Sequence, residues 1–299
     1  MITYREFAKT FGGVHAVRDL SFAVEPGEVV ALLGPNGSGK TTSIKAAAGL
    51  IRPTRGTVLI GEPARPSTEA EARQACSFLP QRVRFPEALT GREVAEFYCR
   101  LRGRGSDRIQ EVMALTGLNG SSARAVGTYS GGMTQRLGLA VAMAAQAPIL
   151  LLDEPTAALD PDGICTFYGL VDSRREHKQT VLFSSHQMGD VERLADRFAV
   201  LVEGRLVASF TARELTTRLA DRGVMKVTVD GLSDEAFASI RRLAPKTVVA
   251  ADQVIVPGAA SVRLAVLDAL RERGVGIRGW SAEEGRLDAF YRELVGGAR

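Results

Sequence analysis

A glycine-rich segment at residues 34–42, GPNGSGKTT, restricts the fold of this chain more than any other feature. It matches the pattern Gly-x-x-x-x-Gly-Lys-Thr, in which glycines let backbone N–H groups turn inward and bind phosphate oxygens. An apolar run over Val29–Leu33 precedes the segment, and a helical pattern over residues 41–49 follows it. The segment is therefore predicted to connect a buried strand to a helix whose N-terminus faces a nucleotide phosphate.

Every residue of this loop has a predicted part in binding. Lys40 is expected to reach the β- and γ-phosphates, and the Thr41 hydroxyl to hold Mg²⁺. Contacts to the nucleotide are also predicted for the rest of the loop: Gly34, Pro35, Asn36, Gly37, Ser38, Gly39 and Thr42. A glycine-rich turn can join a strand to a helix without any ligand, but the full pattern between these two elements favours phosphate binding.

A second apolar run, residues 148–152, ends in the carboxylates of Asp153 and Glu154. Asp153 is predicted to bind Mg²⁺ through water, and Glu154 to orient or deprotonate the water that attacks the γ-phosphate. Carboxylates also end many strands without such a role. Because a phosphate loop is present as well, the pair predicts hydrolysis of the nucleotide.

The order of predicted elements divides the chain into two domains. Residues 1–220 alternate strands and helices, which is typical of a mostly parallel sheet wrapped by helices. Residues 85–145 interrupt this α/β alternation with helical patterns alone, which predicts a helical subdomain. Residues 221–299 follow the order β-α-β-β-α-β with a closing helix, which predicts a small α+β domain of the ferredoxin-like type. No catalytic pattern occurs there, and a regulatory and a dimer-stabilising role are both open.

Composition excludes several classes of protein. The net charge of +4 is not gathered in a long run of lysine and arginine, so no nucleic-acid partner is predicted. The three cysteines, at positions 76, 99 and 165, are too far apart for a metal or redox pair, which predicts reduced thiols in a reducing compartment. The chain has no run of about 18 uninterrupted apolar residues, so no transmembrane helix is predicted.

A second glycine-rich turn, Ser130-Gly131-Gly132, lies on a different predicted helix from the phosphate loop. With this turn added, residues 2–220 resemble the ATP-binding cassette (ABC) family, whose motifs occur here in the family's order. The resemblance implies an ATPase of the ABC type of P-loop NTPase, which uses ATP and Mg²⁺. It also implies further site residues: Phe11 stacking on adenine, Gln81 touching Mg²⁺ and coupling to a membrane subunit, Ser130, Gly131 and Gly132 contacting phosphate, Asp160 in the loop that signals across the dimer, and His186 contacting the γ-phosphate.

Taken singly, three of these residues have plainer interpretations: a core aromatic for Phe11, a surface amide for Gln81 and a structural histidine for His186. Their order along the chain favours the functional interpretation. The complete expectation is Lys40, Gln81, Glu154 and His186 as catalytic residues, and Thr41, Gln81 and Asp153 as the Mg²⁺ site.

The chain departs from the family's pattern at two positions. Phe11 replaces a tyrosine, which keeps the ring and loses only a hydroxyl. Met133 replaces the glutamine that usually ends the second turn, and methionine cannot donate a hydrogen bond to the opposite subunit. Gln135 points elsewhere on a helix and is a poor substitute. Phosphate contacts by Ser130 and the two glycine amides are expected to survive.

The family's geometry implies a head-to-tail homodimer with two ATP molecules at its seam, because the second turn serves the site of the opposite copy. Separate integral-membrane subunits would then carry out transport, with this chain on the cytoplasmic face of the cell membrane as a peripheral protein. Within the family, the chain looks most like the ATPase subunit of the copper-associated transporter that helps mature nitrous oxide reductase.

Two alternatives are open. Drug and small-molecule exporters have closely similar ATPases. A non-transport ABC ATPase that acts on ribosomes or DNA belongs to another class, but such proteins carry two cassettes or long coiled coils, and this chain has one phosphate loop and no heptad run. A module that only binds ATP is disfavoured by Glu154. The transported substrate and the direction of transport do not follow from the sequence.

Overall fold

The computed structural model describes residues 1–103, 105 and 108–297, and it forms two compact units, Met1–Ser209 and Phe210–Arg299. The sequence pattern predicts the boundary after residue 220, and the main difference from the observed boundary is the helix α8 (Ala212–Ala220). This helix belongs with the second unit because Phe210, just before it, packs on Phe290, and the Leu219 carbonyl near its end accepts from the Gly285 amide. Residues 104 and 106–107 of the predicted helical subdomain and 298–299 of the predicted C-terminal domain lie outside the described residues.

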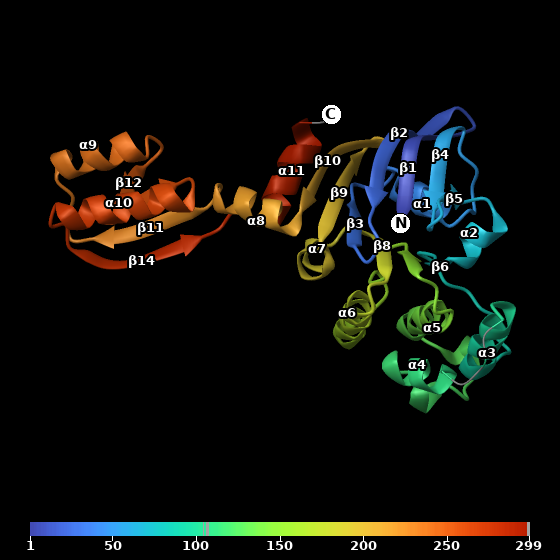
Figure 1. The fold of residues 1–299 in the computed structure, drawn as a ribbon. Coiled ribbons are helices and arrows are strands. Elements are labelled where there is room, and N and C mark those ends of the chain that lie inside the picture. The colour runs from blue at the N-terminus through green and yellow to red at the C-terminus, as the bar shows by residue number, and fades with distance from the viewer. Residues whose placement is uncertain (104, 106–107, 298–299) are drawn as a thin grey trace. The chain divides into compact units, whose positions relative to one another are not determined.

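Among the described residues, ten strands form the sheet of the first unit, in the order β5-β4-β1-β2-β10-β9-β3-β8-β7-β6 (Figure 1). β3, β8, β7, β6 and β9 pair in parallel, whereas β1 pairs antiparallel with β2 and β4. The strands have these bounds: β1 Ile2–Phe11, β2 Val14–Val24, β3 Val29–Leu33, β4 Arg55–Ile60, β5 Arg65–Pro66, β6 Cys76–Leu79, β7 Ile149–Leu152, β8 Thr180–Ser185, β9 Arg197–Val202 and β10 Arg205–Thr211.

β3, β7 and β8 are buried at every residue, as expected of parallel strands covered on both faces. A continuous core joins this sheet to the helix that follows the phosphate loop, through residues such as Phe7, Leu32, Ile44 and Leu151. The helices of the unit have these bounds: α1 Lys40–Ala47, α2 Ala70–Gln74, α3 Gly91–Leu101, α4 Ile109–Leu115, α5 Gly131–Ala144, α6 Pro161–Glu176 and α7 Met188–Leu194, with short 3₁₀ turns at Asn119–Ser121 and Val126–Thr128.

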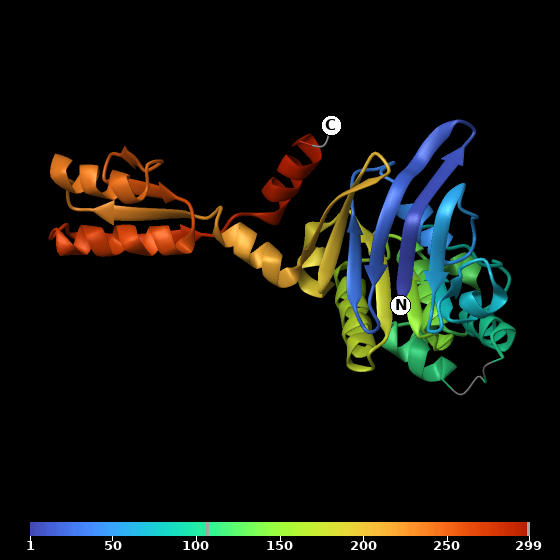
Figure 2. The same ribbon diagram turned by 45° about the horizontal axis from the view of Figure 1, so that its top comes forward.

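The predicted helical subdomain is present. α3, α4 and α5 pack on one another, and Figures 1 and 2 show them grouped beyond the end of the sheet that carries β6 and β7. Thr90 caps α3 through the Glu93 amide, with the Glu93 carboxylate returning to the Thr90 amide. The resulting α/β architecture with a helical insertion confirms the predicted fold class.

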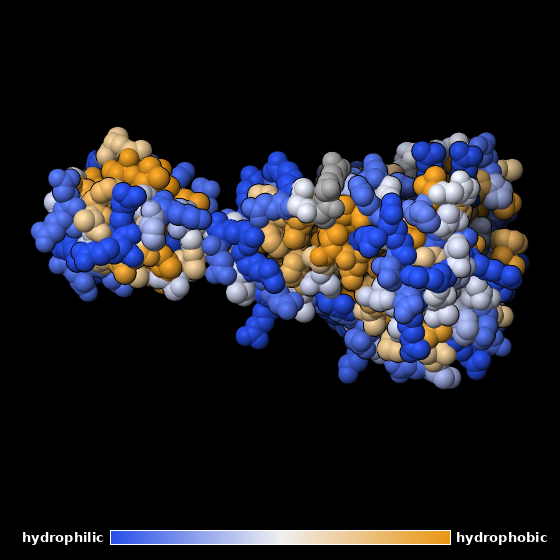
Figure 3. Space-filling view, turned by 90° about the horizontal axis from the view of Figure 1, so that it is seen from above, coloured by the Kyte–Doolittle hydropathy of each residue, from blue (hydrophilic) through white to orange (hydrophobic). Residues whose placement is uncertain are grey.

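The second unit has the ferredoxin-like topology predicted from its element order. Its sheet follows the order β12-β13-β11-β14, and each pair of neighbouring strands is antiparallel. Val227, Ile240, Val254, Val266 and Leu270 belong to its own core. Besides α8, its elements are β11 Val224–Val229, α9 Asp234–Leu243, β12 Val248–Ala250, β13 Gln253–Pro257, α10 Ala260–Glu272, β14 Ile277–Glu283 and α11 Leu287–Gly297. Figure 3 shows that hydrophobic residues reach the surface of each unit among hydrophilic ones.

Two features of the first unit differ from the sequence prediction. The sequence pattern predicts the first two strands over residues 2–7 and 20–24. In the structure the first strand continues to Phe11 and the second begins at Val14, because Gly12 and Gly13 both have positive φ and form a two-residue hairpin turn. His15, Arg18 and Asp19 interrupt the hydrophobic pattern in the first half of β2, so the pattern does not reveal this part of the strand. β6 is also absent from the prediction, since it has only four residues and follows a short helix.

Candidate active site

The phosphate loop lies where the sequence places it, between the buried β3 and α1. Gly39 has φ +104°, and a Cβ at this position would come within 2.7 Å of the Ala16 carbonyl oxygen, so only glycine fits the start of α1. The Ser38 hydroxyl is buried in the loop without a hydrogen-bond partner among the described residues. The loop therefore offers a buried polar atom and a helix N-terminus, as a phosphate site requires.

Lys40 is the cation of the site. Its Nζ donates to the carbonyl oxygens of Gly34 at 2.7 Å and Pro35 at 3.2 Å, so the side chain folds back over the loop. Burial lowers the pKa of Lys40 from its usual value, and the negative charges of Glu154 and Asp153 act in the opposite direction. A desolvated ammonium held over the loop is well placed to bind an anionic ligand there.

Asp153 directly follows β7 and is fully buried. Its Oδ1 accepts from Thr41 Oγ1 at 3.0 Å and from Ser184 Oγ at 2.8 Å, whereas its Oδ2 is buried without a hydrogen-bond partner among the described residues. Burial raises the pKa of Asp153, against the lowering effect of the two hydroxyls, and the neighbouring Glu154 raises it further.

This arrangement fits Mg²⁺. A free carboxylate oxygen beside the Thr41 hydroxyl supplies the hard oxygen ligands that this ion prefers. Within residues 1–103, 105 and 108–297, no group of three or more histidines, cysteines and acidic residues could hold a metal by itself. Mg²⁺ at Asp153 would therefore need phosphate oxygens or water to complete its coordination, as is usual for this ion at nucleotide sites.

Glu154, the predicted base, has its carboxylate at the junction of three segments. Its Oε2 accepts from Gln81 Nε2 at 2.9 Å and lies 3.5 Å from His186 Nδ1. The Glu154 amide donates to Ser184 Oγ at 2.9 Å, and its φ of +48° is unusual for a residue with a side chain. The structure thus brings Gln81, Glu154 and His186 together from three places that are far apart in the sequence.

A cavity of about 460 Å³ opens between the phosphate loop and the side chains of Gln81 and Glu154, and His186 is not among its lining residues. Val14, His15 and Ala16 of β2 line it, and sequence analysis assigned none of them to the site. The cavity is lined by Val14, His15, Ala16, Asn36, Gly37, Ser38, Gly39, Lys40, Thr41, Thr42, Gln81 and Glu154.

Phe11 is not among the cavity's lining residues. It faces Val14 across the hairpin turn, with 49% of the residue exposed and Lys9 Nζ 4.8 Å from its ring centre. Its side chain is thus available at the rim near Val14, and stacking on adenine stays a prediction.

Ser130 caps α5, and its Oγ accepts from the Met133 amide at 3.2 Å. Gly131 and Gly132 form the first turn, but the turn does not line the cavity of its own chain. Gln135 is buried and donates through Nε2 to the Pro155 carbonyl oxygen at 3.1 Å, so it cannot stand in for Met133.

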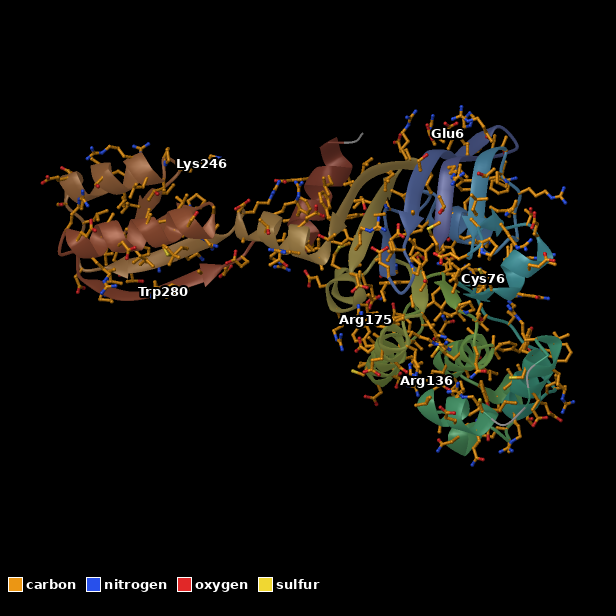
Figure 4. All side chains as sticks on the ribbon, in the orientation of Figure 1. Glu6, Cys76, Arg136, Arg175, Lys246 and Trp280 are labelled. Atoms are coloured by element: carbon orange, nitrogen blue, oxygen red, sulfur yellow. The ribbon has the colours of Figure 1, made fainter. Side chains whose placement is uncertain are left out.

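Asp160 serves the fold as the cap of α6. Its Oδ1 accepts from the Gly163 amide at 3.0 Å and forms an ion pair with Arg136 of α5, which Figure 4 labels. The Arg136 guanidinium, with the Gly163 amide, holds the pKa of Asp160 below its usual value. The loop before α6 is therefore tied to the helix that carries Ser130.

Ser184 is the residue that sequence analysis missed most clearly. It is fully buried and contacts the predicted Mg²⁺ ligand Asp153 through its side chain and the predicted base Glu154 through its amide. The sequence feature that could have identified Ser184 is its position near the end of an apolar strand. That position gains a meaning only when β8 is known to pair with β7.

The phosphate loop, the buried acidic strand end and the parallel sheet define a P-loop NTPase. A family model described as "ABC transporter" matches residues 17–157 of the chain. The chain belongs to the ABC transporter family, in which it is an ATP-binding subunit with the fold of ATP-hydrolysing cassettes.

Three relatives show the kind of protein it is similar to. The linearmycin resistance ATP-binding protein LnrL of Bacillus subtilis is 31% identical over 82% of this chain and 80% of its own length. The daunorubicin/doxorubicin resistance ATP-binding protein DrrA of Streptomyces peucetius is 31% identical over 96% of this chain and 90% of its own. The Nod factor export ATP-binding protein I of Burkholderia lata is 38% identical over 69% of each chain.

Solved structures of ABC cassettes are also similar to this chain. A bacterial ABC transporter cassette solved as a dimer is 27% identical and has a TM-score of 0.66, over 71% of this chain and 99% of its own. An ATP-binding subunit of an ABC transporter is 25% identical, with a TM-score of 0.68 over 73% and 92%. In the described part of this chain, no helix is both long and apolar enough to cross a membrane.

Proposed function

We propose that two copies of this chain hydrolyse ATP at the seam of a head-to-tail dimer and thereby drive export through separate membrane subunits. The observation that carries the proposal is the Glu154 carboxylate, which faces the phosphate-loop cavity with Gln81 and His186 at its Oε2. A carboxylate at this place can accept the proton of an attacking water, and its two neighbours can orient that water and the γ-phosphate.

The remaining residues divide the work of binding. The loop amides and Lys40 bind the phosphates, while Thr41, Asp153 and Gln81 hold Mg²⁺, which when bound neutralises the charge of the phosphate oxygens. Phe11 stacks on the adenine from the rim. Ser184 keeps Asp153 and the Glu154 backbone in register through its two hydrogen bonds.

The second copy is needed because the Ser130-Gly131-Gly132 turn is absent from the lining of the cavity of its own chain. In a head-to-tail pair, the turn of each copy closes the site of the other, with the Ser130 hydroxyl and the glycine amides on the phosphates. The dimeric form of a similar cassette supports this arrangement.

Export is supported by the relatives that are named for drug resistance or for export. The similarity to DrrA covers 96% of this chain, so it reaches well into the second unit. Exposed apolar side chains on α3, namely Phe97, Tyr98 and Leu101, offer a contact for a membrane subunit at the cytoplasmic face. The comparisons do not show the narrower likeness to the copper-associated transporter of nitrous oxide reductase maturation, and we favour an exporter of drug-like molecules.

The test uses Glu154→Gln in the full chain. The variant is expected to bind Mg-ATP, to lose turnover and to elute as a dimer in gel filtration with ATP, whereas the wild type elutes as a monomer once ATP is consumed. Hydrolysis at the wild-type rate would refute the role of Glu154. Stimulation of the wild-type ATPase by a co-purified membrane protein supports export, and stimulation by ribosomes or DNA instead would refute it.

A further inference from the structure

Asp190 of α7 has a buried carboxylate that the proposed mechanism does not use, with 1% of the residue exposed. Its Oδ2 accepts from Thr156 Oγ1 at 2.7 Å and from Ser185 Oγ at 2.9 Å, and its Oδ1 accepts from Tyr168 OH at 2.9 Å. Hydrogen bonds to an ionised acceptor are roughly twice as strong as those between neutral groups. A network of this kind holds its members rigidly when every member is satisfied.

Two of the three donors come from segments that carry proposed catalytic residues, and the third comes from α6. Thr156 follows Glu154 by two residues, and Ser185 directly precedes His186. Tyr168 lies on α6, the helix that Asp160 caps. One carboxylate therefore connects the segment that bears the base to the segment that bears the γ-phosphate histidine, and joins both to α6.

Ser184 and Ser185, the last two residues of β8, form hydrogen bonds on opposite faces of the strand. Ser184 points to one face, where its hydroxyl contacts Asp153 and the Glu154 amide. Ser185 points to the opposite face, as the alternation of a strand requires, and contacts Asp190. The end of β8 is thus held on both faces just before His186.

The segment after β7 is also held at two points, one at Glu154, whose backbone conformation is unusual, and one two residues later. Glu154 has φ +48°, and such a conformation persists only where the surrounding structure enforces it. The Glu154 amide is bonded to Ser184 on one side, and Thr156 is bonded to Asp190 on the other.

We propose that Asp190 is a positioning residue for hydrolysis, which fixes Glu154 relative to His186 without touching nucleotide. The proposal rests on the roles proposed above for these two residues. It assigns Asp190 an effect on the chemical step and none on nucleotide affinity, since Asp190 lies outside the lining of the cavity.

The test compares three substitutions in the full chain, measuring kcat for Mg-ATP, the equilibrium Kd for ATP and the thermal midpoint of unfolding. Asp190→Asn keeps the size of the side chain and removes the charge, and it is expected to lower kcat at least about tenfold with Kd changed less than about twofold. Thr156→Val removes the donor beside Glu154 and is expected to lower kcat in the same direction. Tyr168→Phe, the matched control, removes a donor from a helix that bears neither Glu154 nor His186 and is expected to change kcat less than about twofold.

A merely structural role predicts a different pattern, in which kcat falls in step with the thermal midpoint and Tyr168→Phe costs as much activity as Thr156→Val. That pattern would overturn the proposal. The proposal would also be overturned if kcat of Asp190→Asn stayed within about twofold of wild type, or if its Kd rose by as large a factor as kcat fell. If Asp190→Asn does not fold, the kcat values of Thr156→Val and Tyr168→Phe test the proposal: a lower kcat in Thr156→Val alone supports it, and equal losses in both variants overturn it. Glu154→Gln is measured in the same series: an active Glu154→Gln refutes the proposed site, whereas an inactive one beside a fully active Asp190→Asn refutes only the role of Asp190.

Discussion

Replacement of Ser184 by alanine tests the central hydrogen bonds of the site. The change deletes the 2.8 Å bond to the Asp153 carboxylate and removes the acceptor of the Glu154 amide at 2.9 Å. A hydrogen bond to a charged group contributes about 1.5–3 kcal/mol, and a buried donor left without a partner costs about 1–3 kcal/mol. Since water can recover part of this loss in the nearby cavity, we expect Ser184→Ala to lower the free energy of unfolding of the first unit by about 2–4 kcal/mol.

The chain allows this loss to be assigned to one unit. Its single tryptophan, Trp280, lies in the second unit, where Figure 4 labels it, so tryptophan fluorescence in a urea titration reports that unit. Far-UV circular dichroism reports both units. We expect the first unit's transition to move to lower urea by circular dichroism while the fluorescence transition stays in place.

The control is Ser173→Ala, which changes the same residue type on the exposed face of α6. It is expected to alter the free energy of unfolding by less than about 0.5 kcal/mol. The reasoning would be refuted by a loss below about 1 kcal/mol in Ser184→Ala, or by equal shifts of the circular dichroism and fluorescence transitions.

Three further substitutions test the site. Asp153→Asn is expected to raise the thermal midpoint of the nucleotide-free chain at neutral pH, because a carboxyl whose pKa is raised by burial costs stability when it is ionised. This gain in thermal midpoint should vanish as the pH falls through the raised pKa and below the usual carboxyl value. A gain that persists in acid would contradict burial of the charge as its cause. Lys40→Ala is expected to weaken ATP binding in equilibrium titration at least about tenfold, and wild-type affinity would argue against the phosphate-loop role. Met133→Gln is expected to change kcat less than about twofold if the backbone amides carry the contact, and a larger change would show that this side chain limits hydrolysis.

The sequence predicts those parts of the site whose residues are neighbours along the chain. The phosphate loop needs only its own glycines and the elements that flank it, so the backbone of Gly39 and the position of Lys40 follow from local pattern. The acidic pair is recognisable for the same reason, since Asp153 and Glu154 directly follow an apolar strand. The ferredoxin-like order of the second unit likewise follows from the pattern of successive elements.

The hairpin and the positions at the rim are harder to foresee. Gly12 and Gly13 indicate only a turn after Phe11 and not the hairpin that it belongs to. Polar residues in β2 interrupt the apolar pattern of the strand that brings Val14 to the cavity. Which face a strand presents depends on the register of its neighbours, and a single-strand pattern does not contain that register.

By itself, the sequence determined the nucleotide loop, the acidic strand end, the helical insertion and the ferredoxin-like second unit, because each depends on contiguous residues with a repeating pattern. Only the tertiary structure placed Ser184 between Asp153 and the Glu154 amide, and Asp190 among Thr156, Tyr168 and Ser185. These contacts join residues that are 5 to 34 positions apart. The Ser184 contacts form because β7 and β8, which are distant in sequence, pair side by side in the sheet, and the Asp190 contacts form because α7 packs against α6 and β8.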